Sequence, residues 1–280
     1  MPAGPQLDHA VINAKYSMDA AETAFAGLGF QLTERGYHTL GSINHLMILE
    51  SNYVELIGLP GEEGEEQPGR PDIVDAPLGI NGLVFRTEDV AATHAHLEDL
   101  GLAAAPPKSF SRPVRLADGT REAKFSTAHV ASGVFPGGRV YFCQHHTPDL
   151  VWRPEWQRHD NRASTISEFV IASESHASEA ETMAKLLGAE VAGSGDHLTV
   201  ALENAVISLL TPAAYDERFG ALASSLDDRG SIFGALVVSC ADLTGLKQLL
   251  ARAGDVPHAD HGDRATLRES RFDSVLEFAI

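Results

Sequence analysis

The chain has 280 residues, 44% of them hydrophobic and 21% charged, which is typical of a folded globular protein with one or two domains. Its formal net charge of −18 repels phosphate backbones and argues against nucleic-acid binding. The apolar runs are too short to cross a bilayer, so a membrane protein is not expected. The N-terminus lacks a signal-peptide pattern, and a cytoplasmic location is therefore expected.

The first predicted elements follow an order that recurs later in the chain. Residues 7–14, LDHAVINA, alternate in polarity and predict a strand. Residues 18–29 carry apolar side chains at helical spacing and stop at Gly29, which predicts a helix. Further strands are predicted at 41–50 and 52–59. The first unit therefore begins with a strand and a helix and ends with strands.

The same order recurs three more times. The second unit opens with a strand at 80–87 and a helix at 90–101, and it closes with a hairpin and a last strand at 138–146. The third unit opens at 165–173 and the fourth at 231–239. Each again continues with an amphipathic helix that ends at glycine, followed by strands.

The repeated order, βαβββ, predicts an α+β fold of four modules paired into two domains, because one module leaves a sheet face uncovered. The N-terminal domain is predicted at 1–150 and the C-terminal domain at 165–280, with a connector at 151–164. Composition indicates a loop at 61–77. The modules are assigned in chain order to residues 6–60, 78–147, 165–212 and 231–280.

This pattern resembles the vicinal oxygen chelate superfamily in its glyoxalase-like branch, most specifically in LDHAVINA, INHLMILESNYVELIGL and FCQHHTPDLVWRPEWQRH. The resemblance covers the whole chain at the level of repeat order. It implies two open-barrel glyoxalase-like domains, in which paired modules curl into an open barrel that holds a divalent metal, with ligands from the first and last strands of each module. The superfamily includes glyoxalase I, fosfomycin-resistance proteins, methylmalonyl-CoA epimerase and extradiol dioxygenases.

Superposing the modules by sequence shows which of them carries metal-type side chains. His9 falls opposite Gly82, Glu168 and Gly234 in the opening strands, and Glu55 falls opposite Ser208 and Glu277 in the closing strands. Only the first module has a histidine and a carboxylate together. His9, Glu55 and His145 are therefore the predicted ligands of Fe, Mn or Zn, a set of two histidines and one carboxylate.

Other side chains are candidates for the pocket. His45 lies on the strand beside that of Glu55 and shares its face only if the turn between them has three residues, which makes it a candidate ligand or acid–base residue. Arg112 and Arg115 are three apart on one strand, so at most one enters the barrel, where it would bind a substrate oxyanion; Arg112 is the candidate. Tyr53, Gly82 and Cys143 are predicted to contact substrate, with Gly82 leaving open space.

The C-terminal half offers only Glu168 and Glu277 as metal-type side chains, a poor set for a transition metal. It is expected to be structural, closing the molecule or forming a homodimer surface. This differs from extradiol dioxygenases, in which the resemblance would place the metal in the C-terminal domain.

Two functions remain open from the sequence. The first is a metal-dependent glyoxalase-like enzyme acting on a small oxygen-chelating substrate, with lyase, isomerase or dioxygenase chemistry through a metal-stabilised enediolate or related anion. The second is a metal-free small-molecule binding or resistance protein that uses the same cavity.

Overall fold

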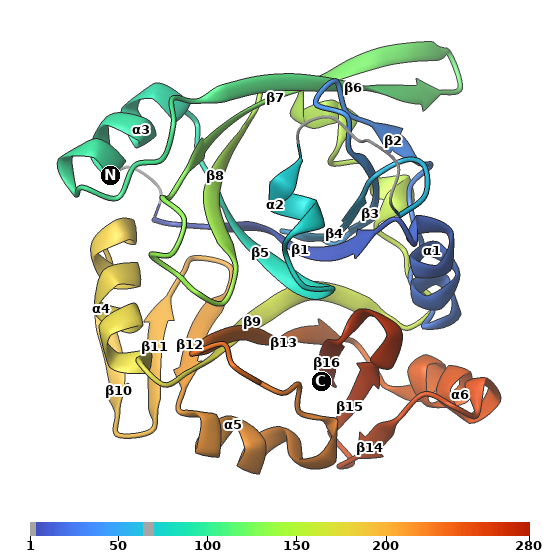
Figure 1. Cartoon of the computed structure of the whole chain (residues 1–280). Coiled ribbons are helices and arrows are strands. Elements are labelled where there is room, and N and C mark those ends of the chain that lie inside the picture. Colours follow the sequence, from blue (N-terminus) through green and yellow to red (C-terminus); the bar gives the residue numbers. More distant parts are fainter. Residues whose placement is uncertain (1–3, 64–69) are drawn as a thin grey trace.

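The computed structural model of the protein describes residues 4–63 and 70–280. These residues form two eight-stranded sheets, and in Figure 1 the N-terminal sheet lies above the C-terminal one. The α+β fold of two paired-module domains is thereby confirmed. None of the helices in the described ranges is long and apolar enough to span a membrane.

The N-terminal sheet has the strand order β2-β3-β4-β1-β5-β8-β7-β6. Its strands are β1 (Leu7–Lys15), β2 (Gly36–Tyr37), β3 (Ile43–Ile48), β4 (Tyr53–Gly58), β5 (Gly79–Arg86), β6 (Lys108–Leu116), β7 (Gly119–His129) and β8 (Arg139–His145). Its helices are α1 (Met18–Gly27), α2 (Pro71–Val74) and α3 (Val90–Asp99), followed by the 3₁₀ turns η1 (Pro148–Leu150) and η2 (Pro154–Trp156).

The C-terminal sheet repeats this arrangement in the order β10-β11-β12-β9-β13-β16-β15-β14. Its strands are β9 (Ala163–Ser173), β10 (Val191–Ser194), β11 (His197–Ala201), β12 (Val206–Leu210), β13 (Ser231–Cys240), β14 (His258–Asp260), β15 (Arg264–Glu269) and β16 (Ser274–Ala279). Its helices are α4 (His176–Leu187), α5 (Pro212–Phe219) and α6 (Thr244–Ala253), with 3₁₀ turns η3 (Gly220–Leu222) and η4 (Ser270–Phe272).

The two modules of each half meet at their opening strands. In the N-terminal half β1 runs antiparallel to β5, and each of them runs parallel to the closing strand of its own module, β4 or β8. This pairing relates the modules by an approximate two-fold axis. It also places the first and last strands of a module side by side, which brings their side chains into one barrel.

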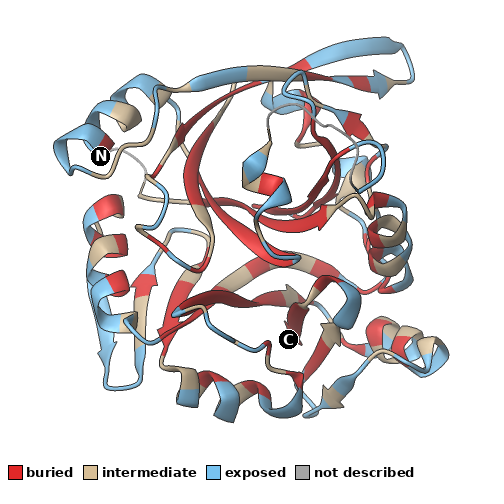
Figure 2. Ribbon diagram, viewed as in Figure 1, coloured by how far each residue is buried: buried red, intermediate tan, exposed pale blue. Residues whose placement is uncertain are grey.

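The central part of each opening strand is buried on both faces of its sheet. Val11 points into the N-terminal barrel, whereas Ala10 and Ile12 face a second core. That second core also includes Phe169 and Leu236 from the other half, so it joins the two sheets. Figure 2 shows the buried residues concentrated on the central strands of both sheets.

Two asparagines hold the halves together in a reciprocal way. Asn52, in the turn between β3 and β4, donates to the carbonyl of Ile166 and accepts from its amide, at 2.9 and 2.8 Å. Asn204, in the turn between β11 and β12, makes the same two bonds with Leu7, both at 2.9 Å. Each half therefore pairs with the opening strand of the other.

The linker between the first two modules differs from the loop expected at residues 61–77, because part of it is helical. Residues 64–69 lie outside the described part of the chain, but Pro71–Val74 forms the single helical turn α2, begun by a proline at its first position. The Asn13 side chain of β1 donates to the Ile73 carbonyl at 2.9 Å. Figure 1 shows α2 within the ring of N-terminal strands, so this linker narrows the barrel.

Candidate active site in the N-terminal barrel

A cavity of about 810 Å³ lies inside the N-terminal barrel. Side chains of the opening and closing strands of both modules line it, among them His9, Tyr53, Glu55, Tyr141 and Cys143. Polar side chains thus converge on a space large enough for a small organic molecule, which is the usual character of a ligand site.

His9 and Glu55 lie next to each other in this cavity. His9 Nε2 is 3.6 Å from Glu55 Oε2, and both side chains are buried. Asn44 of β3 donates to the other carboxylate oxygen, Oε1, at 2.7 Å. The His9 ring stacks on Tyr53 with 4.4 Å between ring centres. The structure therefore brings together two of the three predicted metal ligands and holds both in place.

Asp8 fixes the orientation of the His9 ring. Its Oδ2 lies 2.8 Å from His9 Nδ1, so a proton on Nδ1 leaves the Nε2 lone pair directed toward Glu55. Burial alone would raise the pKa of the fully buried Asp8, but the charges and hydrogen bonds of His145 and His9 hold this pKa well below its usual range. A carboxylate behind an imidazole in this way is typical of histidines that bind metals.

The second module supplies different side chains at the equivalent positions. His9 pairs with Val84 and Val11 with Gly82 across the two-fold axis, which makes Gly82 the counterpart of His9. Val11 lies beside Glu55 in the parallel pair, and its counterpart Val84 lies beside Tyr141. The counterpart of Glu55 is therefore Tyr141, whose hydroxyl is 3.4 Å from His9 Nε2.

The open space expected at Gly82 is absent. A Cβ at this position would lie 2.8 Å from Val11 Cβ and Cγ2, so Val11 already fills the volume. Gly82 is not among the described residues that line the cavity. The glycine permits the close approach of β1 and β5 and makes no room for substrate.

His145 does not reach the His9–Glu55 pair. It shares a face with Tyr141 and Cys143, as alternation predicts, but it lies four residues beyond Tyr141, about 13 Å along the strand. Its Nε2 lies 2.9 Å from Asp8 Oδ2. The described lining of the cavity does not include it.

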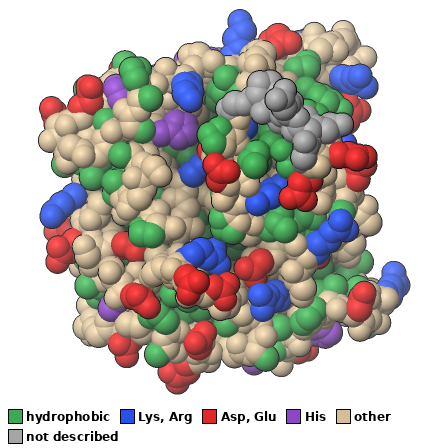
Figure 3. Space-filling view, viewed as in Figure 1, with side chains coloured by type: hydrophobic (Ala, Val, Ile, Leu, Met, Phe, Trp, Pro, Cys, Tyr) green, Lys and Arg blue, Asp and Glu red, His purple; other side chains and the backbone are tan. Residues whose placement is uncertain are grey.

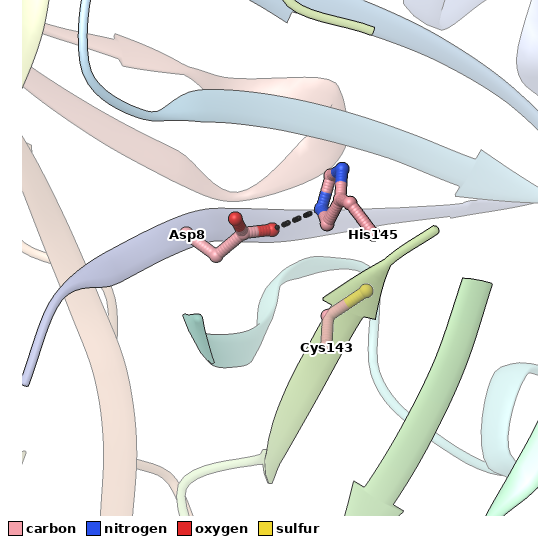
Figure 4. A group of neighbouring side chains, drawn as sticks. All are labelled: Asp8, Cys143 and His145. Carbon is pink, nitrogen blue, oxygen red and sulfur yellow. Dashed lines mark hydrogen bonds and ion pairs between the residues drawn. The ribbon is translucent and has the colours of Figure 1, made fainter. Parts of the chain in front are cut away.

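Asp8, Cys143 and His145 nevertheless form a group of their own, drawn in Figure 4, with one potential ligand atom of each within 4.8 Å of the others. Burial raises the pKa of the Cys143 thiol well above its usual value, and Asp8 is already bonded to two imidazoles and to Arg86 Nε at 3.1 Å. These contacts indicate that Asp8, Cys143 and His145 form a structural polar cluster behind the His9–Glu55 pair.

His45 lies on the opposite face of the sheet from Glu55. It is paired directly with Leu56, and Leu46 is paired with Glu55, because the turn leaves an even number of residues between the facing positions Ile48 and Tyr53. His45 Nδ1 contacts the Thr33 carbonyl at 2.8 Å, outside the described lining of the cavity. The acid–base role expected of His45 is therefore wrong for this cavity, and Asn44 faces it instead.

Arg112 is the arginine of its strand that enters the barrel. It is buried and lines the cavity, whereas Arg115 is exposed. The Arg112 Nη2 atom is buried with no hydrogen-bond partner among the described residues. Burial lowers the pKa of this guanidinium, and the nearby Glu55 only partly offsets that effect. A buried cation without a paired carboxylate is costly unless a ligand supplies one.

Several lining residues were not predicted from the sequence, among them His38, His129 and Arg139. Burial lowers the pKa of both His38 and His129 to about 4, so these imidazoles are neutral at neutral pH. Arg139 begins β8, and its Nη1 lies 2.6 Å from Asp72 Oδ2 of α2. The sequence placed Arg139 at the start of a predicted closing strand, but this position does not show which face of the sheet its side chain lies on.

The C-terminal barrel fills the equivalent space with its own side chain. Its counterparts of His9 and Tyr141 are Glu168 and Glu277, and Arg218 of α5 contacts both, at 2.7 and 2.9 Å. The counterpart of Gly82 is Ala235 and not the expected Gly234, because a register shift lies between Phe233 and Ala235. A guanidinium therefore occupies the centre of this barrel.

The donor set of the N-terminal barrel fits a divalent ion. Two ligands of a tetrahedral ion with bonds of about 2.1 Å lie about 3.4 Å apart. The distance from His9 Nε2 to Glu55 Oε2 is 3.6 Å, and that from His9 Nε2 to the Tyr141 hydroxyl is 3.4 Å. His9 and Glu55 thus offer an imidazole and a carboxylate at a ligand spacing, whereas burial raises the pKa of the Tyr141 hydroxyl well above its usual value, so Tyr141 stays a neutral phenol.

Comparison with known proteins agrees with this architecture. The model of the glyoxalase-like domain family matches residues 7–187, and the chain belongs to this family. A search of curated proteins finds no sequence that matches.

Solved structures share the fold at low sequence identity. A hypothetical protein from Staphylococcus aureus is 14% identical with a TM-score of 0.69, and the match covers 98% of each chain. A mutant of 4-hydroxymandelate synthase from Streptomyces coelicolor is also 14% identical, with a TM-score of 0.58, over 99% of this chain and 92% of that one. A fusion of a xylose isomerase-like TIM barrel with 4-hydroxyphenylpyruvate dioxygenase is 12% identical, with a TM-score of 0.55, over 99% and 50%.

Proposed function

We propose that the protein is a metal-dependent enzyme that acts on a small oxygen-chelating substrate in the N-terminal barrel. The observation that carries this proposal is the contact of 3.6 Å between His9 Nε2 and Glu55 Oε2 inside a cavity of about 810 Å³. A bound divalent ion would act as a Lewis acid on a substrate oxygen, which suits isomerase, lyase or dioxygenase chemistry. Two of the structural relatives are named as a synthase and a dioxygenase fusion, so the fold is one that carries enzymes.

The surrounding side chains have separate roles in this proposal. Asp8 orients His9, and Asn44 holds Glu55 through its Oε1 atom. Arg112 binds an anionic oxygen of the substrate, since its guanidinium is buried beside Glu55 without an ion pair among the described residues. The C-terminal barrel has a structural role, because Arg218 fills its centre.

Metal binding by purified protein tests the proposal. Protein without a His-tag is stripped with chelator, and Mn(II), Fe(II) or Zn(II) is added while the melting temperature is followed. A site formed only in the native state raises the melting temperature on binding. We expect stabilisation of the wild type, its loss in His9→Ala and Glu55→Gln, and its retention in His258→Ala, a histidine exposed on the surface.

A second candidate function is metal-free binding of a small anion in the same cavity. It is favoured by Gly82 and Tyr141, which provide neither imidazole nor carboxylate where the second module would complete a metal site. Absence of metal-induced stabilisation in the wild type, or its persistence in both site variants, would select this function over the first.

A further inference from the structure

We propose that the substrate is a dianion, an organic acid with an oxyanion group at each end, and that Arg112 and Arg139 bind the two ends. The inference rests on the proposed function for the position of the reacting end, beside Glu55. Its evidence comes from the charges of the cavity and from the partners of the two arginines.

The cavity carries excess positive charge inside an acidic protein. Among the residues that the structure describes, five cationic side chains and three carboxylates line it. The cations are Arg70, Lys108, Arg112, Arg139 and Arg229, and the carboxylates are Glu55, Asp72 and Asp75. The chain as a whole has a net charge of −18, and Figure 3 shows basic side chains interspersed with acidic ones on one outer face. This excess of two positive charges among the described lining residues favours a ligand with two negative charges.

The positive charge is distributed over two places. Arg112 has no ion pair with any described carboxylate, and it lies near Glu55. Arg139 shares Asp72 with Arg70, at 2.6 and 2.8 Å, which leaves one carboxylate between two guanidinium groups. Arg139 Nη2 is buried with no hydrogen-bond partner among the residues described. Each place therefore has a buried guanidinium nitrogen without a partner among the described residues; the Arg139 place carries about one unit of positive charge, whereas Glu55 offsets the charge of Arg112.

The two arginines enter the cavity from different strands. Arg112 lies on β6 and Arg139 on β8, with β7 between them, so the strands are about 10 Å apart at the usual spacing. The side chains of Tyr53, Phe125 and Tyr141 also line the cavity. This arrangement fits a ligand with two charged ends and an apolar spacer.

Binding of defined diacids tests this inference without turnover. Glutarate, adipate and pimelate are titrated calorimetrically into protein in EDTA, next to their monoamides and to 3-phosphonopropionate. A charge-assisted contact at the second end makes each fitting diacid bind roughly 10- to 100-fold tighter than its monoamide. Tighter binding of the phosphonate than of the diacids would assign a phosphate end; the reverse order would assign two carboxylates, and either order supports a dianion.

Variants assign the two ends. Arg112→Met and Arg139→Met should each remove the preference for diacid over monoamide, whereas Arg115→Met, on the exposed side of the same strand as Arg112, should keep it. Arg139→Lys retains the charge at that end and should retain part of the preference if Arg139→Met folds poorly. Equal affinity for diacids and monoamides in the wild type, or loss of the preference in Arg115→Met, would overturn the inference.

The same titration separates this inference from the proposed function. His9→Ala and Glu55→Gln remove metal binding but leave both arginines. If metal binding fails and the diacid preference persists, the enzyme proposal fails and the dianion site stands. If metal binds and diacids show no preference, the reverse holds.

Discussion

Arg218 Nη1 lies 2.7 Å from Glu168 Oε1, and Arg218 Nη2 lies 2.9 Å from Glu277 Oε1. One guanidinium thereby joins two carboxylates at the centre of the C-terminal barrel, at the positions that carry His9 and Tyr141 in the N-terminal barrel. Glu277 is only 4% exposed at its side chain, so its charge depends on Arg218 for compensation.

Replacing Arg218 should destabilise the protein strongly. Arg218→Met leaves Glu168 without an ion pair to any described residue and Glu277 with only Arg264, at 4.0 Å. We expect the free energy of unfolding to fall by about 3 kcal/mol, the lower end for a broken buried pair because Arg218 and Glu168 are partly exposed. Chemical denaturation measures this loss. The triple variant Glu168→Gln, Glu277→Gln, Arg218→Met should recover much of it, and failure to recover would contradict the electrostatic explanation.

The stabilisation that the Arg218–Glu168 ion pair provides should decrease as pH falls. Burial would raise the pKa of Glu168, but the hydrogen bond and charge of Arg218 lower it in the folded state. The contribution is therefore complete above the unfolded carboxyl pKa of about 4.3 and disappears as pH falls through the lower folded value. The stability difference between wild type and Arg218→Met should shrink below about pH 4; a difference constant from pH 7 to 3 would refute this.

Gly82 should tolerate no side chain while Val11 is present. The Cβ of Gly82→Ala would lie 2.8 Å from Val11 Cβ, so we expect a loss of about 1–3 kcal/mol from overpacking. In a Val11→Gly background the same change should cost less than about 1 kcal/mol, because both clashing atoms of Val11, Cβ and Cγ2, are gone. Equal costs in both backgrounds would show that Val11 is not the cause.

Asp8→Asn should weaken metal binding and spare anion binding. The amide no longer fixes His9 with the Nε2 lone pair toward Glu55, and loss of such a partner lowers metal affinity about 10- to 100-fold. Metal titration and diacid titration on the same preparation measure the two effects. Asp149→Asn, an exposed change, is the control, and unchanged metal affinity in Asp8→Asn would exclude an orienting role for Asp8.

Mild acid should destabilise the fold through two buried histidines. Burial lowers the pKa of His38 and of His129 to about 4, so the unfolded chain binds more protons than the folded protein once pH falls below about 6.5. Each histidine should therefore lower the free energy of unfolding by about 2 kcal/mol between pH 7 and pH 5. Denaturation of His38→Gln and His129→Gln at both values should show a smaller loss than the wild type, and His258→Gln should show the same loss.

The fold could be predicted from the sequence because the same order of elements occurs four times along the chain. The order of strand, helix and strands recurs, and short-range patterns suffice to recognise it. The adjacency of His9 and Glu55 follows from the same order, since the first and last strands of a module are neighbours. Predicting that His9 and Glu55 are neighbours therefore required no knowledge of side-chain packing.

The remainder of the site depended on register and loop parity, which the sequence does not contain. Tyr141 and His145 lie on one face of one strand, and only the pairing with β5 shows which of them stands opposite Glu55. His45 changes face with one residue of turn length. Arg218 lies between the third and fourth modules, where no pattern marked a side chain bound for a barrel interior.

The paired contacts of Asn52 and Asn204 make the two halves mutually dependent in folding. Each asparagine satisfies the backbone of the opening strand of the other half at Ile166 or Leu7, so a half made alone would leave those groups without these partners. The halves should therefore unfold in a single transition, and a ligand that stiffens the N-terminal half should slow hydrogen exchange in the C-terminal half.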